Sequence, residues 1–305
     1  MNPFPTNRTP GSAAKRIGRS TLRIAITGVT LTLCAAAANA ADNRKETKLE
    51  LAPGGNITIV NGGGSVLLRS AFSGRQVDVA YTTHSDKVEV DVNATADKQR
   101  IELRTHTIAG QKPTPDEAKV DFEISVPPGA VVNVSTLSAP VTAEGVSGDI
   151  TLSSESGQID VHNMTKSHLH ARSMSAPVSL TGITNTHVDV QSSGGAVHMS
   201  NVTGPRVSVG TTSGNVDYRG DCSGGGDYLF TTHSGEIDMW LPKTASVELL
   251  AHSRTGAVEN EFPLQEKTHP SLSPPQGRSF AGTSNSGSSS VELQSINGKI
   301  RVKKQ

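Results

Sequence analysis

The sequence predicts an all-β fold, a parallel β-solenoid (β-helix) with coils of about 19 residues and two strands per coil. A small-residue turn motif recurs along the chain at a nearly constant spacing. Apolar residues stand at fixed places on both sides of that motif. The composition combines 30 glycines with only 3% aromatic residues, which suits short strands joined by tight turns better than packed helices.

The turn motif is a pair of small residues, then any residue, then Val or Ile. Its eight copies begin at Ser138, Ser156, Ser175, Gly194, Ser213, Ser234, Thr255 and Asn297. Successive copies follow one another at a nearly even period, and the last gap equals two periods. One repeat cannot bury its own apolar side, and successive copies are therefore expected to stack around a shared core.

Apolar columns flank the second small residue of each motif. They stand seven and five positions before it and two and four positions after it. The first of these columns contains Val132, Ile150, Leu169, Val188, Val207, Tyr228, Leu249 and Val291. Apolar positions two apart indicate a strand with one buried face. Each coil should therefore contain one strand before the turn and one after it.

Polar and glycine positions recur at the corners of the predicted coils. The column three before the second small residue contains only serine and threonine, whose hydroxyls can bond a neighbour or a turn amide. A second corner recurs at Gly145, Asn163, Gly182 and Asn201. Glycine and asparagine adopt a positive φ at low cost. The pattern does not define the hand of the solenoid.

The predicted organisation is a signal peptide at residues 1–40, a flexible tail at 41–49 and a β-solenoid domain at 50–303. Residues 76–126 are expected to form longer alternating strands. A Pro/Ser/Gly-rich loop, residues 263–290, is expected as an insertion. The final coil ends with Lys299, Arg301, Lys303 and Lys304. These charges are expected to discourage end-to-end stacking of molecules.

Residues 1–40 have the three parts of a secretory signal peptide. Five basic residues precede an apolar stretch, residues 24–38, and Ala38-Asn39-Ala40 supplies the small residues of a cleavage site. The stretch is shorter than the roughly 20 residues of a membrane span, so a permanent anchor is the weaker alternative. A lipoprotein signal at Cys34 is disfavoured by the bulky Leu33. The sequence thus predicts export to the periplasm or cell surface, with no transmembrane segment after cleavage.

Charge content argues against one class of partner, and cysteine content excludes an intrachain disulfide. The formal net charge is zero and the basic residues beyond the leader are scattered, which gives a nucleic-acid partner no electrostatic support. After cleavage only Cys222 remains, so no intrachain disulfide can form. Cys222 precedes Ser-Gly-Gly-Gly and is expected in an exposed corner loop, as a free thiol or an intermolecular disulfide.

These features together resemble the bacterial DUF4097 family, whose members are also called candidate adhesins. The resemblance lies in the signal peptide, the Asn-Gly-Gly-Gly-Ser-Val element at 61–66, the Ser-Gly-x-Ile/Val turns and the closing Ile-Asn-Gly-Lys-Ile strand at 296–300. It covers roughly residues 50–303. It implies a β-solenoid outside the cytoplasmic membrane, with no established chemistry and no site residues to carry over. The loop at 263–290 and a histidine-rich face depart from the family pattern.

The histidine-rich face is the one candidate metal site. Residues eight and six before the second small residue should point outward, which places His168 and His170 beside His187 and Asp189 of the next coil. Three imidazoles and a carboxylate could bind Zn²⁺ or Cu²⁺. Two alternatives are a solvated polar face and a cluster that gains charge near pH 6.

No catalytic signature accompanies the repeats. Asp217 and Asp238 have the spacing of a carboxylate pair on adjacent coils, but no aromatic platform stands beside them, and solubilising edge charge is the alternative. Neither a Gly-x-Ser-x-Gly elbow nor a phosphate-binding loop is present. Trp240, the only tryptophan, is expected either to pack under the Leu241-Pro242 bend or to serve as a binding anchor. The sequence therefore predicts a non-enzyme without a cofactor.

The function predicted from the sequence is a binding, adhesion or scaffold module of the bacterial cell envelope. Its partner is expected to be an envelope polymer or another protein, recognised by many weak contacts on repeated polar faces. A β-helical polysaccharide-processing enzyme is one alternative. An envelope sensor of metal or pH that uses the histidine cluster is another.

Overall fold

The structure is a computed structural model that describes residues 43–71, 74–222, 224–266 and 277–305. The predicted signal peptide, residues 1–40, lies outside the described residues. Every regular element within them is a β-strand, so the all-β prediction is confirmed. In this part of the chain no helix is long and apolar enough to cross a membrane.

Twenty-five strands follow one another along the described chain. The first twelve are β1 (Asn43–Glu50), β2 (Asn56–Asn61), β3 (Gly64–Ser70), β4 (Gln76–Thr83), β5 (Val88–Ala94), β6 (Arg100–Thr107), β7 (Val120–Val126), β8 (Ala130–Thr136), β9 (Val141–Glu144), β10 (Gly148–Ser154), β11 (Ile159–His162) and β12 (His168–Ser173). The others are β13 (Val178–Ile183), β14 (His187–Ser192), β15 (Val197–Val202), β16 (Arg206–Thr211), β17 (Val216–Arg219), β18 (Asp227–Thr232), β19 (Ile237–Leu241), β20 (Val247–Ser253), β21 (Val258–Asn260), β22 (Gln265–Glu266), β23 (Ser279–Thr283), β24 (Ser289–Ser295) and β25 (Ile300–Lys304).

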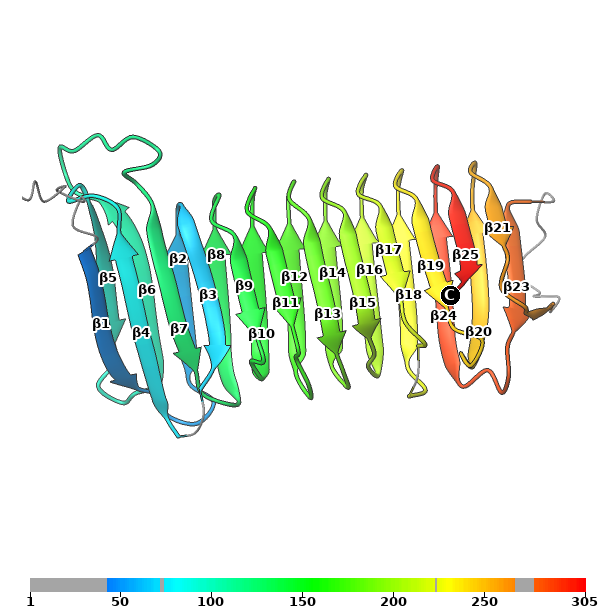
Figure 1. The fold of residues 1–305 in the computed structure, drawn as a ribbon, viewed down its shortest axis with the longest axis horizontal. Helices are drawn as coiled ribbons and strands as arrows, with labels where there is room; N and C mark the ends of the chain where they lie inside the picture. Colours follow the sequence, from blue (N-terminus) through cyan, green and yellow to red (C-terminus); the bar gives the residue numbers. More distant parts are fainter. Residues whose placement is uncertain (1–42, 72–73, 223, 267–276) are drawn as a thin grey trace, which may run out of the picture. The chain divides into compact units, whose positions relative to one another are not determined.

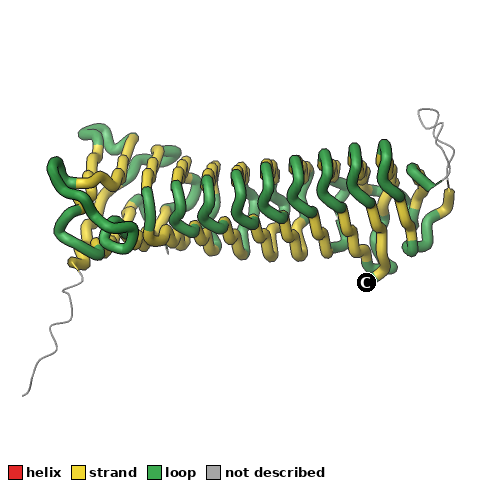
Figure 2. The backbone as a smooth tube through the Cα atoms, turned by 90° about the horizontal axis from the view of Figure 1, so that it is seen from above, coloured by secondary structure: helices red, strands yellow, loops and turns green. Residues whose placement is uncertain are grey.

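The strands form two long sheets that enclose the core (Figure 1). Sheet A has 12 strands in the order β1-β4-β7-β3-β9-β11-β13-β15-β17-β19-β25-β21. Sheet B has 13 strands in the order β22-β23-β20-β24-β18-β16-β14-β12-β10-β8-β2-β6-β5. From β8 to β19 each coil gives one strand to sheet B and the next to sheet A, and the strands within each sheet are parallel. This confirms the parallel β-solenoid with two strands per coil, and Figure 2 shows the coils in succession.

The registers reproduce the sequence period. His168 pairs with His187 across β12 and β14, one period further along the chain, and Arg206 pairs with Asp227 across a slightly longer coil. The predicted apolar columns point inward, and Leu169, Val188 and Val207 are at most 2% exposed. Alternation of buried and exposed residues along each strand therefore produces one continuous core.

Each turn is closed by its buried serine or threonine. The Ser192 hydroxyl donates to the Gly195 carbonyl at 2.6 Å, whereas the Ser154 hydroxyl accepts the Gly157 amide at 2.8 Å. These bonds satisfy polar groups that burial would otherwise leave unpaired. The predicted bond to a turn amide is thus observed, and the same column also bonds turn carbonyls.

The two corners use glycine for different reasons. At the second corner, Asn163 and Gly182 have φ values of 56° and 66°, as the sequence predicts. At the Ser-Gly turn the reason is space, because a Cβ on Gly214 would lie 2.0 Å from the carbonyl oxygen of Gly195 in the neighbouring coil. The turn motif therefore holds small residues where the coils approach most closely.

The coils at both ends do not stack in chain order. The last coil, β24 and β25, lies between β18/β19 and β20/β21, as the red strands of Figure 1 show. At the other end, β2 and β3 lie between β8/β9 and β6/β7. The final coil therefore does not form the end of the stack, because β25 has a neighbour on each side. The expectation that its charges discourage end-to-end stacking of molecules is wrong for this reason.

Two predicted irregular segments contain strands. Residues 43–50 form β1, antiparallel to β4, where the sequence predicts a flexible tail at 41–49. This pairing covers the open edge of β4. Within the predicted 263–290 loop, β22 and β23 pair with each other and β23 pairs antiparallel with β20, which covers the edge of sheet B. Residues 267–276 lie outside the described residues.

Cys222 is fully buried, so the prediction of an exposed corner is wrong. Its backbone has a φ of 50°, and its carbonyl accepts a 2.6 Å hydrogen bond from the Ser289 hydroxyl. The core here encloses Tyr218 and Tyr228, whose ring centroids are 6.1 Å apart. Burial raises the pKa of the Cys222 thiol to about 12. Such a thiol is unreactive near neutral pH, which overturns the intermolecular disulfide alternative.

Candidate functional site

The four candidate metal ligands form two separate pairs on the outer face of sheet B. His168 lies opposite His187, with ring centroids 4.8 Å apart. His170 lies opposite Asp189, with 3.5 Å between Nδ1 and Oδ2. No group of three or more His, Cys, Asp or Glu residues in the described part of the chain is placed to hold a metal ion. The structure therefore places the residues of adjacent coils side by side, as predicted. Within the described residues it does not bring three of them together as ligands of one metal ion.

A long polar groove lies on the same outer face, beside the two pairs. It has a volume of about 1240 Å³ and crosses seven strands of sheet B, from β10 through β12, β14, β16, β18 and β24 to β20. No motif in the sequence predicts this groove. Asp189 is the one residue of the histidine cluster that also lines the groove.

The floor of the groove is a continuous row of outward-facing residues in register. This floor row consists of the residues four positions before the second small residue of each coil: Ser153, Arg172, Gln191, Gly210, Thr231, Gln294 and His252. Gly210, which has no side chain, stands at the middle of the row, between Gln191 and Thr231. Asp189 and Ser208, which stand two positions before Gln191 and Gly210 on their strands, widen the lining by one further row.

The rim of the groove is the row at the start of each Ser-Gly turn. This rim row consists of Glu155, Met174, Ser193, Thr212, His233, Ile296 and Arg254. Its backbone amides donate to the carbonyls of the buried Ser/Thr column in the neighbouring coil, as Ser193 N–H does to Ser173 at 3.0 Å. The rim is thus held rigidly by the backbone while its side chains remain exposed.

Most of the polar side chains that the groove exposes have no intramolecular partner. Within the described residues, the side chains of Arg172, Gln191, Ser208, His233, His252 and Arg254 make no hydrogen bond or ion pair. Three of the lining residues that are not buried are engaged: Asp189 faces His170, Gln294 donates to Glu292 at 2.6 Å, and the Thr231 hydroxyl donates to the Val209 carbonyl at 3.2 Å. The buried serines and threonines of the lining bond groups of the turns, as Ser192 does. Because most of the exposed hydrogen-bonding groups of the groove are unengaged, the groove can accept an external polar ligand while few internal contacts are broken.

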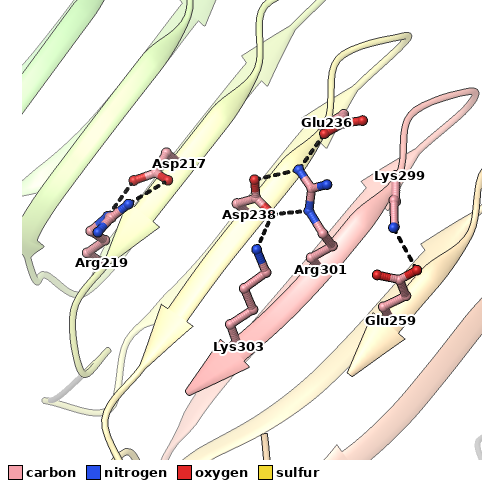
Figure 3. A network of polar contacts seen from close by, with 8 residues as sticks. All are labelled: Asp217, Arg219, Glu236, Asp238, Glu259, Lys299, Arg301 and Lys303. Atoms are coloured by element: carbon pink, nitrogen blue, oxygen red, sulfur yellow. Dashed lines mark hydrogen bonds and ion pairs between the residues drawn. The ribbon is translucent and has the colours of Figure 1, made fainter. Parts of the chain in front are cut away.

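The opposite face, on sheet A, shows the contrary arrangement (Figure 3). Arg301 bonds Asp238 at 2.5 Å and also pairs with Glu236. Lys299 pairs with Glu259 at 2.6 Å. Partial burial raises the pKa of Asp238, but the bond to Arg301 outweighs this, so the pKa is lowered overall. The charges of this face are therefore largely neutralised by one another.

The two predicted catalytic carboxylates belong to that network. Asp217 is bonded by Arg219 at 2.9 Å, and Asp238 is bonded by Arg301. The bond to Arg301 stabilises Asp238 as an anion and makes it a poor proton donor. The geometry therefore gives no support to an acid–base pair there.

Trp240 lies in the same region, half-buried on the outer face of sheet A. The Arg219 guanidinium lies 5.0 Å from the centre of its ring and the Lys303 ammonium 4.5 Å from it. The ring is thus covered by cations of the two neighbouring strands. It neither packs under the Leu241-Pro242 bend alone nor stands free as a binding anchor.

Comparison with known proteins places the fold in a family. The Toastrack DUF4097 family profile matches residues 54–303, which confirms the resemblance noted in the sequence. None of the curated proteins is similar to this chain.

Several solved structures are similar to it. They include a candidate cell adhesion protein from Clostridium sporogenes, with 14% identity, a TM-score of 0.25 and coverage of 86% of this chain and 100% of that chain. A candidate adhesin from Bacteroides fragilis has 12% identity, a TM-score of 0.33 and coverages of 86% and 97%. A candidate lipid binding protein from Parabacteroides distasonis has 8% identity, a TM-score of 0.29 and coverages of 86% and 98%. The family assignment rests on the profile match and not on these structures.

Proposed function

Because this chain belongs to the Toastrack DUF4097 family and carries an unengaged polar groove, we propose that it is a non-enzymatic binding or adhesion module of the bacterial cell envelope. An extended partner, such as an envelope polymer, docks along the outer face of sheet B. The rigid stack of coils acts as the scaffold that presents this face.

The observation that carries the proposal is the contrast between the two outer faces. Charged groups on sheet A pair with each other, as Arg301 does with Asp238. Polar groups in the sheet B groove, such as Arg172 and Gln191, have no partner within the described residues. Unengaged donors and acceptors on a rigid surface are what a weak, additive binding site requires.

The geometry of the groove favours binding over catalysis. Its two carboxylates are Glu155, in the turn after β10, and Asp189, on β14, and β12 lies between these strands. Two strand spacings alone amount to roughly 9.6 Å, the upper end of the separation of about 6.5–9.5 Å that inverting glycosidases use. The offset of the two positions along the strands adds further distance. Among the described residues, no Phe, Tyr or Trp lines the groove to hold a sugar ring.

An envelope location is part of the proposal. It is supported by the basic leader, the apolar stretch at residues 24–38 and the Ala-Asn-Ala site that ends at Ala40. Export would place the groove in the periplasm or at the cell surface, where polymers of the envelope are abundant.

Filling the groove tests the proposal. Gly210→Tyr is expected to weaken binding to a purified, protein-free envelope polysaccharide fraction by about tenfold or more, since a ring on the floor displaces ligand from the centre. The fold should tolerate the change, because a Cβ at this position would meet Thr231 Oγ1 at an ordinary 3.6 Å.

Ser179→Tyr, on the outer face of sheet A, is the matched control and should bind like the original protein. Co-sedimentation with the fraction gives both affinities. Equal binding by both variants would show that the groove is not the docking surface.

A further inference from the structure

We propose that the groove takes an extended, hydroxyl-rich polymer that carries anionic groups, and that Arg254, His252 and His233 hold these groups at the β20 end. This inference rests on the proposed function and names the chemistry of its ligand. It follows from the direction of the groove, its hydrogen-bonding groups and its uneven charge.

The direction of the groove requires an extended ligand. Seven strands separated by about 4.8 Å give it a length of roughly 29 Å along the stack. The backbone groups of these strands are paired with neighbouring coils on both sides, from β10 to β20. A peptide therefore cannot bind here by adding a strand to the sheet. Recognition falls to the side chains of the floor row and rim row.

The middle of the groove has the chemistry to bind hydroxyl groups. Ser153, Gln191, Ser208, Thr212 and Thr231 provide hydroxyls and an amide from successive coils. These groups both donate and accept hydrogen bonds, as a polyhydroxylated chain does. Neutral hydrogen bonds compete with water, however, and no Phe, Tyr or Trp ring of the described residues lines the groove to add stacking. Charged contacts, roughly twice as strong, are needed to anchor the chain.

Basic side chains without a neighbouring carboxylate gather at one end of the described lining. The remaining basic residue, Arg172, lies on β12, between the strands that carry or precede the two lining carboxylates. Strands β18, β24 and β20 and the turns after them contribute His233, His252 and Arg254 to the described lining, and no carboxylate. The two lining carboxylates, Glu155 and Asp189, belong to the β10 and β14 region. Glu292 lies one row away on β24 and outside the lining, where it accepts the Gln294 amide. The groove is thus electrostatically polarised along its length.

A second arginine reinforces the cationic end. The guanidinium of Arg278 donates to the Arg254 carbonyl at 3.3 Å, which brings a further positive charge beside the rim. An arginine guanidinium presents a planar set of donors that fits carboxylate and phosphate oxygens. Neither arginine has an acidic partner within the described residues.

The intercalated final coil sets the spacing of these cations. Because β24 lies between β18 and β20, these two strands are about 9.6 Å apart. His233 and Arg254 lie in the turns that follow them, and Ile296 lies in the turn between these two. Basic side chains on separate coils suit charged groups on separate units of an extended chain, which is why a polymer rather than a free anion is inferred.

The anionic groups can be carboxylates or phosphodiesters, and the test separates these sources. The purified protein is titrated at physiological ionic strength with polygalacturonate, a poly(glycerol phosphate), neutral dextran and inorganic polyphosphate of matched length. We expect one or both hydroxyl-rich anionic polymers to bind about tenfold or more tightly than dextran and polyphosphate. The polymer that binds identifies the source.

The triple variant His233→Gln, His252→Gln, Arg254→Gln should lose about tenfold or more of the anionic affinity while weak dextran binding stays unchanged. All three side chains are exposed, so the melting temperature should not change.

The control variant Arg100→Gln, His162→Gln, His198→Gln removes the same residue types from surfaces outside the groove and should bind normally. Equal affinity for dextran and the anionic polymers, unchanged in the triple variant, would overturn this inference but leave the proposed function intact. Polyphosphate binding as tightly as the hydroxyl-rich anions would also overturn it. Failure of every polymer to bind would instead contradict the proposed function.

Discussion

Removal of residues 285–305 is expected to unfold the C-terminal coils rather than merely to shorten the stack. The deleted segment forms β24 and β25, which lie between two other coils. Val291, Leu293, Ile300 and Val302 are at most 1% exposed. Burial of each such side chain contributes about 1.5–3 kcal/mol, so the four contribute about 6–12 kcal/mol, a range comparable to the whole stability of a typical domain.

Hydrogen exchange measures this loss locally. Amides of β20 and β23 should lose protection in the truncated protein, and the melting temperature should fall. Deletion of residues 43–48 is the control, because most of β1 is exposed and pairs on one edge only, so its effect should be small. An unchanged melting temperature, with β18 and β20 paired directly, would contradict the intercalated order.

Val190→Asp is expected to destabilise the protein by about 4–5 kcal/mol or more, because it places an ionisable group in an apolar interior. Val190 is fully buried in β14 and packs in the core between Ala171 and Val209 of the adjacent strands. The aspartate would find no basic partner among these aliphatic neighbours.

Gln191→Asp, at the next position, is the matched control. Gln191 faces outward and is exposed, so the same new carboxylate should change the free energy of unfolding little. Urea denaturation of both variants measures the difference. Similar destabilisation by the two changes would contradict the inward and outward alternation on which the solenoid depends.

The coils were predictable because each repeats the same physical pattern. The spacing of the Ser-Gly turns and the apolar columns predicts the registers observed, such as Leu169 opposite Val188. The second corner was equally predictable, because Asn163 and Gly182 are residues that accept a positive φ.

The order of the end coils was not predictable from the same pattern. Every coil offers similar apolar columns to either neighbour. Val291 and Leu249 would therefore both fit opposite Tyr228 in the same register. Only tertiary packing selects the intercalated arrangement. Cys222 illustrates a related error, because a glycine-rich sequence after it suggested a surface loop while its own side chain points into the core.

The groove was missed because its parts look like ordinary solvated residues in sequence. Gln191 and Thr231 are inconspicuous one by one, and Gly210 reads as a turn former. Their alignment in one row, with few internal partners, becomes visible only when the coils are stacked. The available signal was the column four positions before each second small residue, which holds polar residues from Ser153 to Gln294 except at Gly210.

The claim that the groove of sheet B is the binding face is tested most directly by side-chain amide NMR. Gln191 and Gln294 carry amide groups in the groove, whereas Gln158 carries one on the outer face of sheet A. On titration with the anionic polymer that binds most tightly, the Gln191 and Gln294 signals should shift and the Gln158 signal should not. Shifts confined to Gln158, or equal at all three side chains, would contradict the account.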